Sequence, residues 1–155
     1  MKIWFNDALV DAQSDLLEAD NWPEGFGVFE TIKTVDGFPW AFSRHMRRAV
    51  NSSLKTSIKL PREELIRDSV SLLLRTESHP KGLLRISFDS SGNWAAAHLP
   101  YVEITEPAKV CLHPKVVVTD DVPVKSYPYN HRLEILEQAR TNGFDEALVT
   151  SSKGA

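Results

Sequence analysis

Residues 122–152 read VPVKSYPYNHRLEILEQARTNGFDEALVTSS, and the interpretation of the whole chain depends on this stretch. It has three parts: a loop bounded by prolines that carries Lys125, an amphipathic helix, and a strand over residues 146–150. The helix is indicated by apolar residues at helical spacing and by Gly143 just beyond them. Those apolar residues are Leu133, Leu136 and Ala139. The strand is a short, β-rich apolar run.

Lys125 lies where the loop approaches the helix, close in sequence to Tyr127 and Tyr129. A lysine held among apolar and aromatic neighbours can lose its proton and act as an amine nucleophile that forms a Schiff base. Most lysines are solvated, however, so this stretch alone favours an ordinary surface lysine over a catalytic one.

Length, charge and cysteine content exclude several classes of protein. The chain has 155 residues, which suits one domain or one domain and part of another. Its net charge of −3 argues against a general nucleic-acid binder, which would carry a basic surface. No apolar run has the length of a membrane span. The single cysteine, Cys111, excludes an internal disulfide and favours a cytoplasmic location.

The end of the sequence indicates an incomplete domain. The strand over residues 146–150 is followed by the turn-forming run SSKGA, and a hairpin of this kind requires a returning strand. We therefore expect the sequence to be part of a longer one.

Residues 25–40, GFGVFETIKTVDGFPW, predict a strand and a hairpin. Two sets of β-compatible residues alternate here: Val28, Glu30, Ile32 and Thr34 with Phe29, Thr31, Lys33 and Val35. Asp36-Gly37 is a strong turn signal. Gly25 and Gly27 indicate a bulge or a close approach to the backbone, more readily than a phosphate-binding loop.

Two helices are expected next. The first covers residues 44–55, with Ser43 as its N-cap, and the second covers residues 61–76. The first turn of the earlier helix is basic, with Arg44, His45, Arg47 and Arg48. This is either a solvated basic face or an anion site, in which a forked arginine binds a phosphate and relieves the conflict with the helix dipole.

Two strands are then predicted, over residues 82–89 and 98–105, followed by a strand pair or one bent strand over residues 109–119. Arg85 lies inside the first of these apolar strands. It therefore reaches the sheet edge, pairs with an acid, or binds a substrate carboxylate.

A metal site and a serine triad are both disfavoured. Cys111 and His113 share one face of a strand, but no second pair of ligands occurs at a useful spacing, and no nucleophile-elbow pattern is present.

Three separated segments together resemble the fold-type IV pyridoxal-phosphate enzymes: GFGVFETIKTVDG, then SRHMRRA, then Lys125 with its helix and GFDEALVT. That group includes branched-chain aminotransferases, D-amino-acid aminotransferases and 4-amino-4-deoxychorismate lyases. The resemblance covers nearly the whole chain. It implies an α+β fold, with a small N-terminal domain over residues 1–118 and the beginning of a cofactor-binding domain over residues 119–155.

The resemblance also assigns roles to individual residues. Lys125 matches the lysine that forms a Schiff base with pyridoxal 5'-phosphate, and Arg48 matches the arginine that contacts the cofactor phosphate. The substrate-binding positions are Phe29, Arg85, His98 and Tyr129, and Glu30 is the acid beside the aromatic residue. The arginine that precedes the histidine by two places in the D-amino-acid group is Ala96 here, which weakens that subgroup.

The sequence also departs from the family pattern. The segment after Lys125 contains Pro128 and Tyr129 in place of the usual short run, so the residue that faces the cofactor ring stays open. The glutamate that pairs with the pyridine nitrogen would lie beyond Ala155, so this chain alone should be inactive.

We therefore expect the complete protein to be a 4-amino-4-deoxychorismate lyase, which makes 4-aminobenzoate and pyruvate for folate synthesis. The alternative is a branched-chain or D-amino-acid aminotransferase. An alternative of another class is a non-catalytic fragment that binds or dimerises. The resemblance also implies a cytoplasmic homodimer that acts on a small amino substrate, without nucleic acid, membrane or metal.

Overall fold

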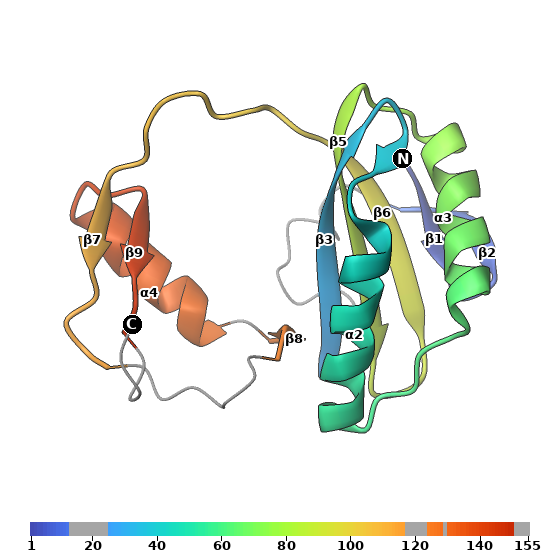
Figure 1. The fold of residues 1–155 in the computed structure, drawn as a ribbon, viewed down its shortest axis with the longest axis horizontal. Helices are drawn as coiled ribbons and strands as arrows, with labels where there is room; N and C mark the ends of the chain where they lie inside the picture. Colours follow the sequence, from blue (N-terminus) through green and yellow to red (C-terminus); the bar gives the residue numbers. More distant parts are fainter. Residues whose placement is uncertain (13–24, 117–123, 129, 151–155) are drawn as a thin grey trace. The chain divides into compact units, whose positions relative to one another are not determined.

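The computed structural model describes residues 1–12, 25–116, 124–128 and 130–150. The chain forms two compact units (Figure 1): residues 1–102 with 124–128, and residues 103–123 with 129–155. None of the helices in this described part of the chain is long and apolar enough to cross a membrane.

The first unit is built on an antiparallel sheet in the order β2-β1-β6-β5-β3-β4, and β8 pairs with β3. The strands are β1 Lys2–Phe5, β2 Ala8–Asp11, β3 Gly27–Val35, β4 Phe38–Pro39, β5 Lys81–Asp89, β6 Trp94–Pro100 and β8 Ser126–Tyr127. Strand β3 pairs with β5 along its whole length. The hairpin between β3 and β4 turns at Asp36 and Gly37, whose φ angles of 48° and 79° are those that a tight two-residue turn requires.

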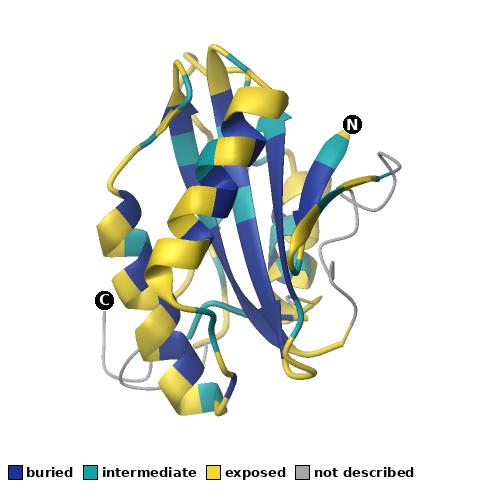
Figure 2. Cartoon of the chain, turned by 90° about the vertical axis from the view of Figure 1, so that its right-hand side faces the viewer, coloured by how far each residue is buried: buried dark blue, intermediate teal, exposed yellow. Residues whose placement is uncertain are grey.

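Two helices cover one face of this sheet: α2 Phe42–Thr56 and α3 Glu63–Thr76. Apolar residues of both helices share one core with the strands, for example Met46, Ile66, Val28 and Ile32. Figure 2 shows the burial concentrated in the central strands and the exposed residues on the outer sides of the helices. Alternation along β3 turns Val28, Glu30 and Ile32 toward the helices and Phe29 away from them.

The second unit contains β7 Val110–Leu112, α4 Asn130–Thr141 and β9 Glu146–Leu148. Strands β7 and β9 pair in parallel, with Cys111 opposite Ala147. Helix α4 ends just before Gly143, whose positive φ of 81° suits the end of a helix.

The structure confirms the α+β class, the β3 hairpin and the three helices, but it corrects several details. Helix α2 begins after Ala41, which has a left-handed φ of 52°, without any side-chain cap, so the Ser43 cap is wrong. Strand β6 is Trp94–Pro100 rather than residues 98–105, because it pairs with β5 directly after a short turn. Helix α4 buries Ile135 and Ala139, while Leu133 and Leu136 are only partly buried.

The division of the chain also differs from the expected boundary at residues 118 and 119. Residues 124–128 belong to the first unit because β8 pairs with β3, and β7 belongs to the second unit because it pairs with β9. Of the strand expected over residues 109–119, the structure forms Val110–Leu112, and residues 117–119 lie outside the described part.

Candidate active site

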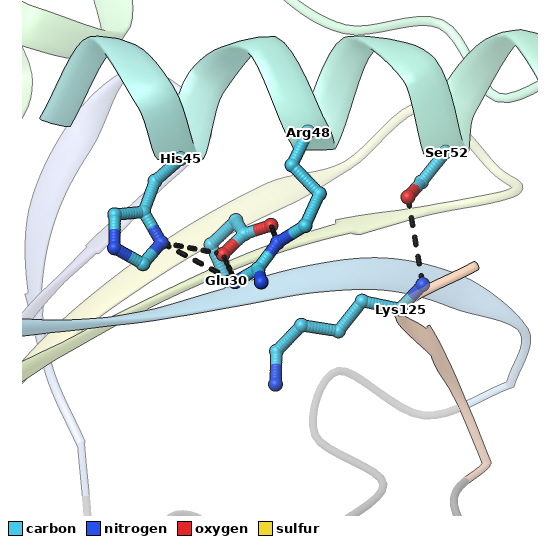
Figure 3. A network of polar contacts seen from close by, with 5 residues as sticks. All are labelled: Glu30, His45, Arg48, Ser52 and Lys125. Carbon is cyan, nitrogen blue, oxygen red and sulfur yellow. Dashed lines mark hydrogen bonds and ion pairs between the residues drawn. The ribbon is translucent and has the colours of Figure 1, made fainter. Parts of the chain in front are cut away.

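The backbone of Lys125 is fixed from two sides within the first unit. Its carbonyl oxygen accepts a hydrogen bond from the N–H of Phe29 at 3.0 Å, which continues the pairing of β8 with β3. Its own N–H donates to the Oγ of Ser52 on α2 at 3.4 Å (Figure 3). Strand β3 and helix α2 therefore position the lysine together, although it follows Ser52 by 73 residues.

The Lys125 side chain lies against an aromatic ring that a second cation also contacts. Its Nζ is 4.4 Å from the centroid of the Phe29 ring, and the Cζ of Arg85 is 5.0 Å from the same centroid. The ring of Tyr127 lies 6.3 Å from that of Phe29. The face of an aromatic ring attracts cations, so Phe29 holds both side chains on the side of the sheet opposite the helices.

Glu30 lies on the helix side of β3, next to Phe29, and its carboxylate is fully buried. Arg48 of α2 donates from Nε to Oε1 at 2.7 Å and from Nη2 to Oε2 at 2.5 Å. The Nδ1 atom of His45 lies 2.7 Å from Oε2. A buried carboxylate is costly unless it is paired and hydrogen-bonded, and these two side chains supply that pairing.

Helix α2 carries three side chains that reach this region from the helix side. His45, Arg48 and Ser52 are separated by three and four positions, so they lie on one face of the helix. Figure 3 shows the three side chains extending from α2 toward β3 and Lys125. The ion pairs of Glu30 and the anchor of the Lys125 backbone are therefore one turn apart.

Tyr127 packs against the backbone of β3 at Gly27. The tyrosine is fully buried, and its hydroxyl has no hydrogen-bond partner among the described residues. Burial raises the pKa of the phenol far above its usual value; Asp89 adds to this effect and Arg85 opposes it. A β-carbon on Gly27 would lie 2.1 Å from the Tyr127 Cζ and Oη, and 2.3 Å from the backbone oxygen of Phe88. Only glycine allows this approach.

His98 lies apart from this cluster. It is fully buried on β6, with Nε2 2.7 Å from the Oγ1 of Thr34 and Nδ1 2.5 Å from the carbonyl oxygen of Glu77. Burial lowers the pKa of the imidazole, the hydrogen bond to Glu77 opposes this, and His79 adds to it. Both ring nitrogens are thus engaged inside the first unit.

The structure brings Lys125, Phe29 and Arg85 together on the face of the sheet opposite the helices. Arg48 lies on the helix side, bound to Glu30, the next residue after Phe29 on β3. His98 is elsewhere, and Tyr129 lies outside the described residues.

Sequence reasoning missed the ion-pairing role of Glu30 and the roles of His45, Ser52 and Tyr127. A signal existed for Glu30: it is in phase with Val28 and Ile32, and a charged residue in phase with a buried strand face requires a partner.

No group of three or more histidine, cysteine or acidic residues that could hold a metal ion occurs in the part of the chain that the structure describes. Cys111, in the second unit, directs its Sγ to the carbonyl oxygen of Glu146 at 3.8 Å.

The family model described as amino-transferase class IV matches residues 27–155. The chain therefore belongs to the class IV aminotransferase family, which confirms the sequence resemblance. No curated protein matches the sequence.

Solved structures share the fold at low sequence identity. A protein provisionally assigned as a 4-amino-4-deoxychorismate lyase matches with a TM-score of 0.74 and 23% identity over 94% of this chain and 60% of its own. The branched-chain aminotransferase of Escherichia coli matches with a TM-score of 0.75 and 16% identity, over 98% and 58%. The pyridoxal-phosphate-bound form of a hypothetical aminotransferase from Mycobacterium tuberculosis matches with a TM-score of 0.76 and 18% identity, over 99% and 63%. The chain thus spans about three fifths of the length of these structures.

Proposed function

We propose that the protein is a pyridoxal-phosphate-dependent 4-amino-4-deoxychorismate lyase, which forms 4-aminobenzoate and pyruvate. The observation that carries the proposal is the placement of Lys125 in a class IV aminotransferase chain. Its backbone is fixed by Phe29 and Ser52, and its amine lies over the Phe29 ring. The fixed backbone holds the amine at one place, where the aldehyde of a cofactor could reach it.

The residues present fit the cofactor. Lys125 offers an amine for its aldehyde, and Arg48, whose side chain is half exposed while its fork rests on Glu30, offers donors for its phosphate. Pyridoxal phosphate, when bound, supplies an aldehyde that condenses with amines and a ring that accepts electrons.

Three residues of the chain would then have separate roles in the reaction. Lys125 would bind the cofactor and, once the substrate amine has displaced it, move a proton at the substrate through Nζ. Phe29 would form an apolar wall that keeps water from the reacting atoms. Arg85, which lies on the same face of the sheet, would bind a substrate carboxylate through its planar fork.

The amino-acid sequences of two segments favour the lyase over an aminotransferase: VFETI at residues 28–32 and DEALV at residues 145–149. A branched-chain or D-amino-acid aminotransferase is the second candidate, supported by the fold shared with the Escherichia coli enzyme. We also propose that the protein is a cytoplasmic homodimer, and this part rests on the family resemblance alone.

Product analysis tests the proposal. The full-length protein is incubated with pyridoxal phosphate and 4-amino-4-deoxychorismate, and pyruvate and 4-aminobenzoate are quantified without a keto acid. Equimolar formation of both, lost in Lys125→Ala, is the expected result. Turnover that requires a keto-acid acceptor would replace the lyase with the aminotransferase.

A further inference from the structure

We propose that Glu30 is a positioning residue, which holds the guanidinium of Arg48 in the orientation that binds the cofactor phosphate, with His45 as the second support of the carboxylate. The inference rests on the proposed function, because it needs Arg48 to be a phosphate ligand. It adds a role for two residues that do not themselves contact the cofactor in the proposal.

The geometry of the ion pair is what an oriented arginine needs. The carboxylate of Glu30 receives Nε and Nη2 of Arg48 in a fork, at 2.7 and 2.5 Å. A guanidinium is planar and carries five N–H donors, so two bonds along one edge fix the plane in which the other donors lie. The side chain of Arg48 is 50% exposed, so the fork holds a group that would otherwise sample many rotamers.

The carboxylate is itself held rigidly. Glu30 is fully buried on a strand that pairs with β5 throughout, so its side chain has little freedom to move. His45, one turn before Arg48 on α2, contacts Oε2 at 2.7 Å from a side chain that is 22% exposed. The support therefore runs from the sheet through Glu30 to Arg48, and His45 fixes the second oxygen.

Stability alone does not account for the carboxylate. A buried ion pair is often no more stable than apolar residues of similar volume, and Val28 and Ile32 occupy the neighbouring core positions on the same face. A negative charge next to Arg48 also reduces the attraction of the arginine for a phosphate. The benefit of Glu30 is therefore the orientation of the Arg48 guanidinium. If so, loss of the carboxylate should weaken binding of the phosphate, whereas the effect of charge alone would strengthen it.

The test compares pyridoxal phosphate with pyridoxal, which lacks the phosphate. Their dissociation constants are measured by absorbance titration of the full-length protein, for the wild type, Glu30→Gln, Arg48→Ala and the double variant. A glutamine can accept only part of the fork, so Glu30→Gln should weaken binding of pyridoxal phosphate about tenfold, the loss expected for one hydrogen bond to a charged group. Binding of pyridoxal should not change, and Glu30→Gln should add nothing in the Arg48→Ala background.

Thr34→Val is the matched control. Thr34 lies on the same face of β3, and its buried hydroxyl contacts His98 rather than Arg48. The control should lose stability without changing the ratio of the two dissociation constants. A loss that is merely structural would weaken both ligands alike.

Each outcome decides a separate point. Unchanged or tighter binding of pyridoxal phosphate by Glu30→Gln would overturn the positioning role, since charge alone predicts tighter binding. An unchanged ratio in Arg48→Ala would remove the phosphate assignment itself, and with it the basis of the inference. If Glu30→Gln does not fold, His45→Ala decides: a change in the ratio of about threefold supports the role, and an unchanged ratio overturns it.

Discussion

Gly27→Ala should damage both the stability of the first unit and the position of Lys125. The added β-carbon would lie 2.1 Å from two atoms of the Tyr127 side chain and 2.3 Å from the backbone oxygen of Phe88. A side chain can shift, but the carbonyl oxygen of Phe88 belongs to the central strand β5. We expect a loss of about 3 kcal/mol in the free energy of unfolding, the upper end of the range for an overpacked core. Alanine also lowers the conformational entropy of the unfolded chain, but this offsets only about 0.4–1 kcal/mol of the lost stability.

The same substitution should weaken cofactor binding, because Tyr127 follows Lys125 by two residues on the segment that pairs with β3. Gly82→Ala is the control, since a β-carbon there would lie 2.2 Å from His98 and 2.7 Å from Thr34, away from Lys125. Urea unfolding and pyridoxal-phosphate titration are measured on both variants. Gly27→Ala should lose stability and cofactor affinity, and Gly82→Ala should lose stability alone. Equal loss of affinity in the two variants, or a fully stable Gly27→Ala, would show that Gly27 does not position Lys125.

Three further predictions follow from single contacts. Tyr127→Phe should leave the free energy of unfolding unchanged or raise it by about 1 kcal/mol in urea titrations, because it removes a buried hydroxyl that has no hydrogen-bond partner among the described residues; a large loss would reveal a bond to that hydroxyl. Phe29→Leu should weaken pyridoxal-phosphate binding about fivefold, by loss of the ring under Lys125, and unchanged titrations would contradict the contact. The free energy of unfolding should fall as the pH drops below about 6.5, because burial lowers the pKa of His98 and the unfolded chain takes up a proton that the folded site excludes. Thermal melts of His98→Asn should show a smaller fall in stability with pH. An equal fall in the wild type and the variant would assign the effect to another group.

The parts of the fold with strong local signals could be predicted from the sequence. The alternation over β3 and the Asp36-Gly37 turn determine a hairpin without help from the rest of the chain. Strand β6 could not be placed correctly because Ala95, Ala96 and Ala97 have little strand propensity. Those alanines are fully buried between β1 and β5, so tertiary packing decides their conformation.

For the site as well, the sequence predicts some residues but not the long-range contacts between them. The predicted roles of Lys125, Arg48 and Phe29 rest on three motifs that occur together, because each motif is too common to be informative alone. Arg85 was singled out by its place inside an apolar strand and by the family resemblance. The contacts of Ser52 with Lys125 and of Glu30 with Arg48 join residues 73 and 18 positions apart. No local pattern encodes such distances. One feature of the sequence did indicate such a contact: Glu30 shares a strand face with the apolar residues Val28 and Ile32.

Reductive trapping shows whether Lys125 is the residue that binds pyridoxal phosphate covalently. The full-length protein is mixed with the cofactor, reduced with borohydride and digested, and the added mass is located by peptide sequencing. We expect one phosphopyridoxyl group on Lys125, absent from Lys125→Ala. A label spread over surface lysines, or no label at all, would contradict it.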